Sequence, residues 1–285
     1  MNKPTQISII IPTYNRAATI GKTIDSFIAQ DYKDWEMLVV DDHSTDNTKE
    51  VIEDYHKRDS RIHYLLNERK KGAQGARNTG ILHAKADWVV LFDSDDIVYP
   101  NFLSRMVAEI DNQTDIITCY ARKVWVDGSQ TKLEEWGGEG NIERMMLKSW
   151  AYINFDDCIF RKSKLLEIGL LDEDCPCMQE WDTHIRLSRV CTYKQIKEPL
   201  LDYMWGAEDA ISYGKQKNKN GYCYVMNRNK TRWKELEYES FYGIARWLFF
   251  DVDFKHKLLL IYLCPQILIR LPRMILGRVK RMVKQ

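Results

Sequence analysis

Apolar residues in the first hundred positions follow two alternating patterns. Short, nearly continuous apolar runs predict four β-strands, at residues 8–11, 36–40, 62–66 and 88–92. Between these runs, apolar side chains recur at helical spacing around residues 20–28 and 51–55, and residues 75–84 are also predicted to be helical. Strands of this kind, separated by helices, are typical of an α/β fold in which helices cover both faces of a parallel sheet.

From about residue 115 the pattern becomes mixed. It predicts strands at residues 116–120 and 123–126, and a helix over residues 180–190. We further expect a polar, basic loop over residues 213–221 and an aromatic-rich helix over residues 241–250.

Polar residues directly follow three of the predicted strands. Residues 13–16 follow the first strand, residues 41–44 the second and residues 93–96 the fourth. In open parallel sheets, ligands bind beyond the carboxyl ends of the strands. We therefore expect the three clusters to meet at one edge of the sheet and to form a binding site there.

The acidic residues of these clusters indicate what such a site could bind. Asp93 and Asp95 flank Ser94, and carboxylates suit Mg²⁺ or Mn²⁺, which proteins usually bind together with substrate phosphates. The alternative is that residues 93–96 only cap the next helix. Asp42, at a strand end, could accept hydrogen bonds from a nucleobase or a ribose. Arg77 lies in a glycine-rich cationic stretch that is by itself a weak phosphate-binding signal.

Composition and charge exclude several classes of protein. The 285 residues carry a formal net charge of +1, so no overall field favours nucleic acid as a partner. The N-terminus does not have the pattern of a signal peptide, and no stretch reaches the roughly 20 apolar residues of a membrane span. The seven cysteines are scattered and odd in number, which favours reduced thiols in a cytoplasmic protein.

Four motifs in the first hundred residues resemble those of a known family. SIIIPTYNR at residues 8–16, VVDDHSTDNT at 39–48, GARN at 75–78 and LFDSDD at 91–96 are similar to the inverting family-2 glycosyltransferases of GT-A fold, of the type that builds bacterial surface polysaccharides. Weaker likeness continues through residues 169–173 and 179–186 and fades beyond about residue 215.

The resemblance implies the fold and its division into parts. It implies an α/β, Rossmann-like GT-A fold with a mostly parallel sheet, helices on both faces and a C-terminal helical appendage. Residues 1–212 would form the glycosyltransferase domain, with a nucleotide-binding half at 1–100 and an acceptor-side half at 101–212. Residues 213–285 would form a basic, helical C-terminal region.

The resemblance also assigns roles to individual residues. Asp95 and Asp93 would hold the divalent ion, Mn²⁺ or Mg²⁺, with Asp96 as a further candidate of second rank. The nucleotide of the donor would be bound by residues from all four motifs: Pro12, Thr13, Tyr14, Arg16, Asp42, Arg77, Asp93 and Ser94.

Glu180 falls where the family places its catalytic base, which is usually an aspartate. Asp182 is the second candidate, and helical geometry directs the two side chains differently. The alternative without a catalytic role is that Glu180 is an ordinary exposed residue of a helix. A further departure is Trp205-Gly206, which stands where relatives often carry a histidine after the tyrosine, so the resemblance assigns no metal or phosphate contact to that loop.

The implied reaction is a metal-assisted single displacement. A sugar would move from a nucleoside-diphosphate sugar, expected to be a UDP-sugar, to a saccharide or lipid-linked saccharide acceptor with inversion. Two alternatives remain open: a nucleotidyltransferase that makes sugar nucleotides, and a catalytically silent nucleotide- or carbohydrate-binding protein. The missing Gly-x-Gly-x-x-Gly after the first strand disfavours a dehydrogenase.

The C-terminal segment 255–285 carries lysines and arginines but no aspartate or glutamate. Mixed apolar and cationic residues suit an anionic membrane surface, which would place the protein on the cytoplasmic face of the inner membrane. The equally favoured alternative is a pair of helices packed on the domain with solvated basic side chains. Pro265 and Pro272 exclude a single long helix.

Overall fold

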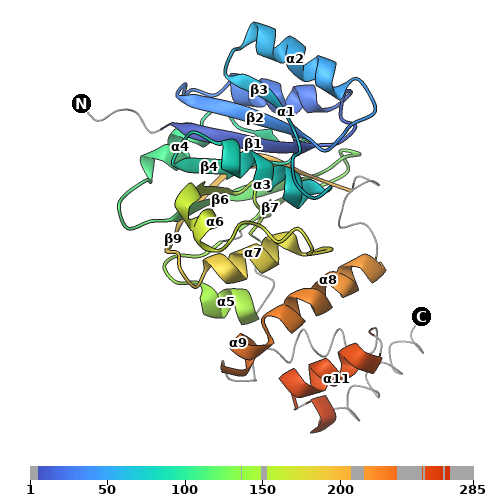
Figure 1. Ribbon diagram of the computed structural model, residues 1–285. Coiled ribbons are helices and arrows are strands. Elements are labelled where there is room, and N and C mark those ends of the chain that lie inside the picture. Colours follow the sequence, from blue (N-terminus) through green and yellow to red (C-terminus); the bar gives the residue numbers. More distant parts are fainter. Residues whose placement is uncertain are drawn as a thin grey trace. The chain divides into compact units, whose positions relative to one another are not determined.

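The chain folds into two compact units, which are described separately. The computed structural model describes residues 6–135, 137–148, 153–206, 215–235, 252, 254–265 and 267–269 (Figure 1). The larger unit comprises Met1–Ile142, Ala151–Asp174 and Gln179–Ala210. The smaller unit comprises Glu143–Trp150, Cys175–Met178 and Ile211–Gln285.

The first half of the larger unit is a parallel sheet. Its strands are β1 (Ile7–Thr13), β2 (Trp35–Asp41), β3 (Ile62–Leu66) and β4 (Trp88–Leu91), in the spatial order β3-β2-β1-β4. All three neighbouring pairs are parallel. Every residue of β1 and β2 is buried, which accounts for their continuous apolar runs.

Helices cover both faces of this half, as the sequence predicts. Helix α1 (Ile20–Ile28) and helix α2 (Thr48–Arg58) pack on the face that carries Ile7, Ile9 and Ile11. Helix α3 (Ala73–His83) lies on the other face, where Gly80 approaches Ile10 of β1 and Val40 of β2. This close approach packs the C-terminal half of α3 against β1 and β2.

The second half of the sheet is mixed. It contains β5 (Ile97–Val98), β6 (Ile116–Trp125), β7 (Thr131–Glu134), β8 (Cys158–Arg161) and β9 (Tyr193–Trp205). Among the described residues the full order is β3-β2-β1-β4-β8-β6-β9-β5, with β7 beside β6. Strand β8 is antiparallel to β4 and β6, whereas β6 and β9 are parallel. The two strands predicted at 116–120 and 123–126 are one continuous strand, β6.

The described part of the larger unit also contains α4 (Phe102–Ala108), α6 (Lys162–Glu167) and α7 (Gln179–Leu187). Helix α7 buries Trp181, Ile185 and Leu187, and the backbone N–H of Ser188 donates a hydrogen bond of 2.8 Å to the His184 carbonyl of its last turn. The predicted α/β fold is confirmed, with the refinement that only the first half of the sheet is wholly parallel.

Most of the described residues of the smaller unit are helical. It contains α5 (Glu143–Lys148), α8 (Lys215–Arg228), α9 (Lys230–Glu235) and α11 (Phe254–Leu263). Arg232 of α9 donates two bonds of 2.7 Å to the Glu143 carboxylate, and the Trp233 indole donates to the Leu147 carbonyl at 2.8 Å. No helix in the described ranges is long and apolar enough to cross a bilayer.

One expectation for the smaller unit is wrong. The predicted loop at 213–221 is helical from Lys215 onwards, because α8 continues into residues that share one buried face: Tyr222, Cys223, Val225 and Met226. The polar first half of α8 carries no such signal by itself. The helix expected over 241–250 lies outside the described residues.

Gly80 offers a test of the contact between α3 and the sheet. A Cβ at position 80 would overlap the Ile10 side chain and lie 3.2 Å from Val40. We expect Gly80→Ala to lower the free energy of unfolding by about 1–3 kcal/mol, because overpacking outweighs the helix propensity of alanine. Urea denaturation measures the change, with Leu82→Ala on the exposed side of α3 as the control. Equal or greater stability of Gly80→Ala would contradict this packing.

Candidate functional site

The loops that follow β1 and β2 are tied together at the carboxyl edge of the sheet. The Asp42 amide donates to the Thr13 carbonyl at 2.8 Å. Asn15 has a left-handed φ of 53°, and its amide donates to the Ser44 hydroxyl oxygen at 2.8 Å. The Asn15 side chain in turn accepts from the Thr45 amide at 2.8 Å. Two of the three polar clusters therefore form one surface.

Asp42 holds the loop that leads into α3. It is buried, and its two carboxylate oxygens accept from the Asn67 side chain at 2.7 Å and from the Gly72 amide at 2.8 Å. Gly72 has a φ of 126°, a conformation that requires glycine. A carboxylate oxygen can accept a second bond, so Asp42 keeps capacity for a ligand while it shapes this loop.

The other nucleotide candidates near β1 differ in exposure. Pro12 and Thr13 are buried at the end of β1, and the Thr13 hydroxyl has no hydrogen-bond partner among the described residues. Tyr14 is 45% exposed, with the Lys71 ammonium 5.0 Å from its ring centroid, and Arg16 is half-buried. An exposed aromatic ring beside a buried hydroxyl suits a flat, polar ligand such as a nucleobase.

Arg77 is the buried cation of the site. Its guanidinium donates to the Gln74 side chain at 2.9 Å and to the Asp93 carboxylate, and it lies over the Phe155 ring at 5.0 Å. Burial works against the charge, but Asp93, Glu180 and Asp156 outweigh it and raise the pKa of Arg77. The side chain therefore stays protonated between α3 and the loop after β4.

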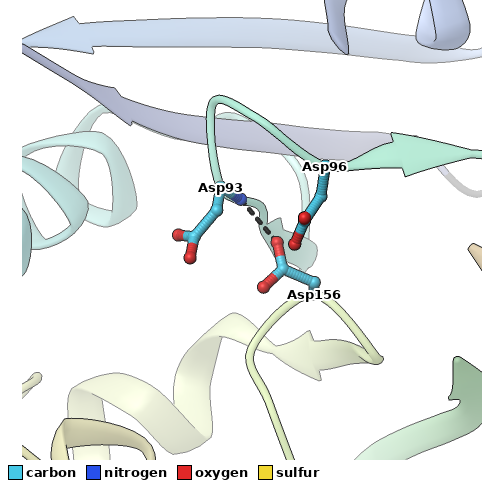
Figure 2. A group of neighbouring side chains, drawn as sticks. All are labelled: Asp93, Asp96 and Asp156. Carbon is cyan, nitrogen blue, oxygen red and sulfur yellow. Dashed lines mark hydrogen bonds between the residues drawn. The ribbon is translucent and has the colours of Figure 1, made fainter. Parts of the chain in front are cut away.

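Three carboxylates, one of which accepts a hydrogen bond from Arg77, lie close to one another, as Figure 2 shows for Asp93, Asp96 and Asp156. Asp93, Asp96 and Asp156 each offer one oxygen, and these oxygens all lie within 4.8 Å of one another. The Asp93 amide donates to Asp156 at 2.5 Å, and the Met204 amide of β9 donates to Asp96 Oδ1 at 2.7 Å. The second oxygen of Asp96 is buried and has no hydrogen-bond partner among the described residues.

This acidic cluster holds more negative charge than Arg77 neutralises. Burial, followed by repulsion from Asp156, Asp95 and Asp93, raises the pKa of Asp96 well above its ordinary value. Burial and Asp93 likewise raise the pKa of Asp156, although the Asp93 amide and Arg77 oppose the shift. Such a cluster binds either protons or a cation. Closely spaced hard oxygen ligands and the unpartnered Asp96 oxygen fit a divalent ion such as Mg²⁺ or Mn²⁺.

The structure divides the predicted metal ligands into two groups. Asp93 and Asp96 belong to the acidic cluster, whereas Asp95 is exposed and is not one of its three members. Asp95 still lies close enough to raise the pKa of Asp96. Ser94, which is assigned to the nucleotide, lies between Asp93 and Asp95 in the sequence, and its side chain is buried.

Asp156 is the residue that sequence reasoning missed. It precedes β8, which runs antiparallel to β4, so the start of β8 lies at the edge where β4 ends. The only signal in the sequence is an acidic pair, Asp156-Asp157, directly before the apolar run at residues 158–160. Its position becomes predictable only once the direction of β8 is known.

Glu180 and Asp182 lie in the first turn of α7 but differ in their surroundings. Burial raises the pKa of half-buried Glu180, Arg77 opposes this shift, and Asp93 adds a smaller upward contribution, so Glu180 is within electrostatic reach of both groups. Asp182 is fully buried and accepts from Arg186 of the same helix at 2.9 Å. Arg186 also donates to the Ile168 and Leu170 carbonyls. Of the two carboxylates, Glu180 is the one that acts electrostatically on Arg77.

The model of a known protein family matches the part of the chain that contains most of these site residues. The model described as glycosyl transferase family 2 matches residues 8–181, a range that includes the strands β1–β4, the acidic cluster and Glu180. The chain belongs to glycosyl transferase family 2. The predicted family is confirmed, and the relatives and solved structures described next carry the names of the predicted class of enzyme, glycosyltransferases.

Two curated relatives are similar to the N-terminal third of the chain. The Escherichia coli UDP-Glc:alpha-D-GlcNAc-diphosphoundecaprenol beta-1,3-glucosyltransferase WfgD is 44% identical over 102 residues, 36% of this chain and 40% of the relative. The Campylobacter jejuni GalNAc(5)-diNAcBac-PP-undecaprenol beta-1,3-glucosyltransferase is 40% identical over 103 residues, 36% of this chain and 33% of the relative. The chain thus spans less than half of either relative. Neither name supports the nucleotidyltransferase alternative.

Solved structures share the fold at low sequence identity. S. aureus TarS 1–349 in complex with UDP-GlcNAc has a TM-score of 0.68 at 17% identity, over 91% of this chain and 79% of TarS. The Pyrobaculum calidifontis mannosyltransferase PcManGT in complex with GDP-Man and Mn²⁺ has a TM-score of 0.59 at 18% identity, over 78% of this chain and 63% of that one. The predicted GT-A fold is therefore confirmed.

Replacing Asp156 tests whether the acidic cluster binds a divalent cation. Asp156→Asn keeps an oxygen that accepts from the Asp93 amide but removes one negative charge from the cluster. We expect its affinity for Mn²⁺ to fall roughly tenfold or more, as seen when groups around metal sites are lost. Titration followed by electron paramagnetic resonance measures the affinity. The control is Asp157→Asn, because Asp157 lies outside the acidic cluster and accepts from the Asn154 amide. Equal Mn²⁺ affinity of Asp156→Asn and the wild type would contradict the assignment.

Proposed function

We propose that the protein transfers a sugar from a UDP-sugar to a saccharide or lipid-linked saccharide acceptor, with inversion at the anomeric carbon. The observation that carries the proposal is that a family-2 chain gathers Arg77, Glu180 and the acidic cluster at the carboxyl edge of its parallel strands. The named substrates of the two relatives support a lipid-diphosphate-linked acceptor. The TarS complex and the WfgD name support UDP as the nucleotide.

The nucleotide of the donor would bind at the joined loops after β1 and β2. The exposed Tyr14 ring can stack on a base, and the Thr13 hydroxyl and the Asp42 carboxylate can bond to a base or a ribose. Pro12 and Arg16 border the same loop, and Asp93, Ser94 and Arg77 continue the site towards the acidic cluster.

A divalent cation, Mn²⁺ or Mg²⁺, would be held by carboxylates from the loop after β4 and from the start of β8. Asp93, Asp96 and Asp156 are the clustered candidates. The exposed Asp95, next to Asp96 in the sequence, would bind a cation that is also bound by the diphosphate of the donor. When bound, the cation supplies positive charge that stabilises the departing diphosphate. Arg77 fixes the Asp93 carboxylate and contributes a second positive charge.

Glu180 would act as the general base. Its carboxylate takes the proton of the acceptor hydroxyl as that oxygen bonds to the anomeric carbon. The bond from the same carbon to the diphosphate oxygen breaks, and its electron pair leaves with the diphosphate. Attack opposite the leaving group inverts the configuration. Burial shifts the pKa of Glu180 upwards, towards neutral pH. A general base is most effective when its pKa lies near the pH at which the enzyme works.

Glu180→Gln tests the transfer reaction directly. We expect kcat to fall by about 10²–10⁴, because the amide cannot accept the proton, while affinity for UDP stays unchanged. Product formation from a UDP-sugar and a diphosphate-linked N-acetylglucosamine acceptor is measured by mass spectrometry. Formate should partly restore activity to Glu180→Ala, since a small carboxylate can replace the missing base.

Asp182→Asn is the matched control for the base. It weakens the ion pair with Arg186, so we expect a lower Tm with kcat largely kept. Loss of kcat in a stable Asp182→Asn variant, with Glu180→Gln active, would reverse the assignment.

The pH dependence of the wild type also tests the base. Its kcat should fall with decreasing pH as Glu180 becomes protonated, at a pH above the ordinary glutamate range because burial raises the pKa of Glu180.

We extend the proposal to the membrane surface through α11. Phe254, Leu258 and Tyr262 recur every fourth residue on this helix and are 75%, 51% and 52% exposed. Lys255 and Lys257 lie among them, and the basic sequence from residue 270 contains no acidic residue. Apolar side chains flanked by cations suit the surface of an anionic bilayer, where a lipid-linked acceptor is found. The protein would then act as a peripheral protein on the cytoplasmic face of the inner membrane.

Replacing two of these side chains tests the membrane surface. Leu258→Ser combined with Tyr262→Ser should reduce binding to vesicles that contain phosphatidylglycerol by roughly tenfold or more, because less apolar area enters the interface. Flotation measures the bound fraction, and Leu82→Ser, at a 52% exposed position of α3, is the control. Unchanged flotation of the double variant would contradict a role of α11 in membrane binding.

A further inference from the structure

Strands β6 and β9 place four side chains on one face of the sheet. The parallel register pairs Lys123 with Tyr203 and Trp125 with Trp205. Because residues two apart on a strand share a face, all four side chains project to the same side. The Tyr203 and Trp205 rings lie 6.2 Å apart, and Trp205 remains 37% exposed. We call these four residues the aromatic platform.

The aromatic platform begins beside the acidic cluster. The Met204 amide of β9 donates to Asp96 at 2.7 Å. Burial, followed by the charges of Asp96, Asp93, Glu180 and Asp156, raises the pKa of the Tyr203 hydroxyl. Tyr203 is therefore within electrostatic reach of the carboxylates and of the proposed base. Trp205 lies two residues further along β9, about 7 Å from Tyr203.

Lys123 is the cation of this platform and forms no ion pair with a carboxylate among the described residues. Its ammonium lies 3.3 Å from the Trp205 ring centroid and 5.2 Å from that of Trp125. Burial and Lys132 lower the pKa of Lys123, while Glu134 raises it. The Glu134 carboxylate is itself bound by Lys132 at 3.1 Å, and no carboxylate in the described part of the chain forms an ion pair with Lys123.

An ammonium that lies over two indole rings and forms no ion pair suits a strongly anionic, partly desolvated group. Contact with the rings removes part of the side chain from water, and lower hydration strengthens the attraction of an ammonium to an anion. Neighbouring strands lie about 5 Å apart, so Lys123 is one strand further from Asp96 than Tyr203 is. A group bound there would be separated from the reacting centre by about one sugar unit.

We infer that Lys123, framed by Trp125 and Trp205, binds the diphosphate of a lipid-linked acceptor whose sugar extends over Tyr203 towards Glu180. This inference rests on the proposed transferase function and adds how its acceptor is recognised. The exposed Trp205 ring offers an apolar surface to the sugar or to the first part of the lipid. Lys123 therefore selects diphosphate-linked saccharides over neutral glycosides.

Two acceptors that differ only in the diphosphate test this inference. One is N-acetylglucosamine diphosphate with a short alkyl chain, and the other is the N-acetylglucosaminide of the same chain. We expect Lys123→Met to lower kcat/KM for the diphosphate acceptor roughly 10- to 100-fold, mainly through KM, because a charge-assisted bond is lost. The neutral acceptor should be affected little. Methionine keeps the apolar stem between the two rings.

Two further variants separate charge recognition from packing. Lys123→Arg keeps the charge and should retain the preference for the diphosphate acceptor. Lys194→Met removes a different cation, one on β9 that pairs with Glu109, and should leave the preference unchanged. The KM for the nucleotide sugar and the slow hydrolysis of the donor should be the same in all variants.

The outcomes distinguish this inference from the proposed function. Equal use of both acceptors by the wild type, an equal loss on both acceptors in Lys123→Met, or a raised KM for the donor instead would overturn the role of Lys123 while transfer itself stands. Nucleotide binding by the wild type without transfer to either acceptor would overturn the proposed function, and the acceptor inference with it.

Discussion

The site depends on the imbalance between one buried arginine and the carboxylates around it. Arg77 donates to Asp93 and is held in its charged form by Asp93, Glu180 and Asp156. It cannot neutralise all of them, and burial together with repulsion between the carboxylates raises the pKa of Asp96 and Asp156. Burying unbalanced charge is costly, so the cluster is a poor way to stabilise a fold and a good way to bind a cation. The same deficit would draw in the cation that a departing diphosphate needs.

The scaffold holds this imbalance in place through both kinds of strand pairing. The parallel strands β1, β2 and β4 end at one edge and deliver Thr13, Asp42 and Asp93. The antiparallel strand β8 begins at that edge and delivers Asp156. Asp96 is fixed from a third direction by the Met204 amide of β9. A mixed sheet is therefore needed, since a wholly parallel one would place the start of β8 at the opposite edge.

The sequence predicts the parallel half well because its signals are local. Each buried strand is a continuous apolar run, and the polar residues that matter come directly after it, so Asp42 and Asp93 could be identified without knowledge of the topology. Glu180 was identified by the resemblance alone, and its proximity to Arg77 arises from tertiary packing of α7. Asp156 was missed because its place depends on the direction of β8. Lys123 carries no signal, because its contacts are Trp125 in its own strand and Trp205 more than eighty residues away.

The most direct test of the charge imbalance is a crystal structure of the protein grown with UDP and Mn²⁺, with anomalous scattering recorded to locate the manganese. The account predicts a manganese peak at the acidic cluster, coordinated by carboxylate oxygens that include Asp93, Asp96 or Asp156, with the UDP diphosphate beside it. A manganese ion bound elsewhere, with the three carboxylates protonated and bonded to one another, would contradict the account.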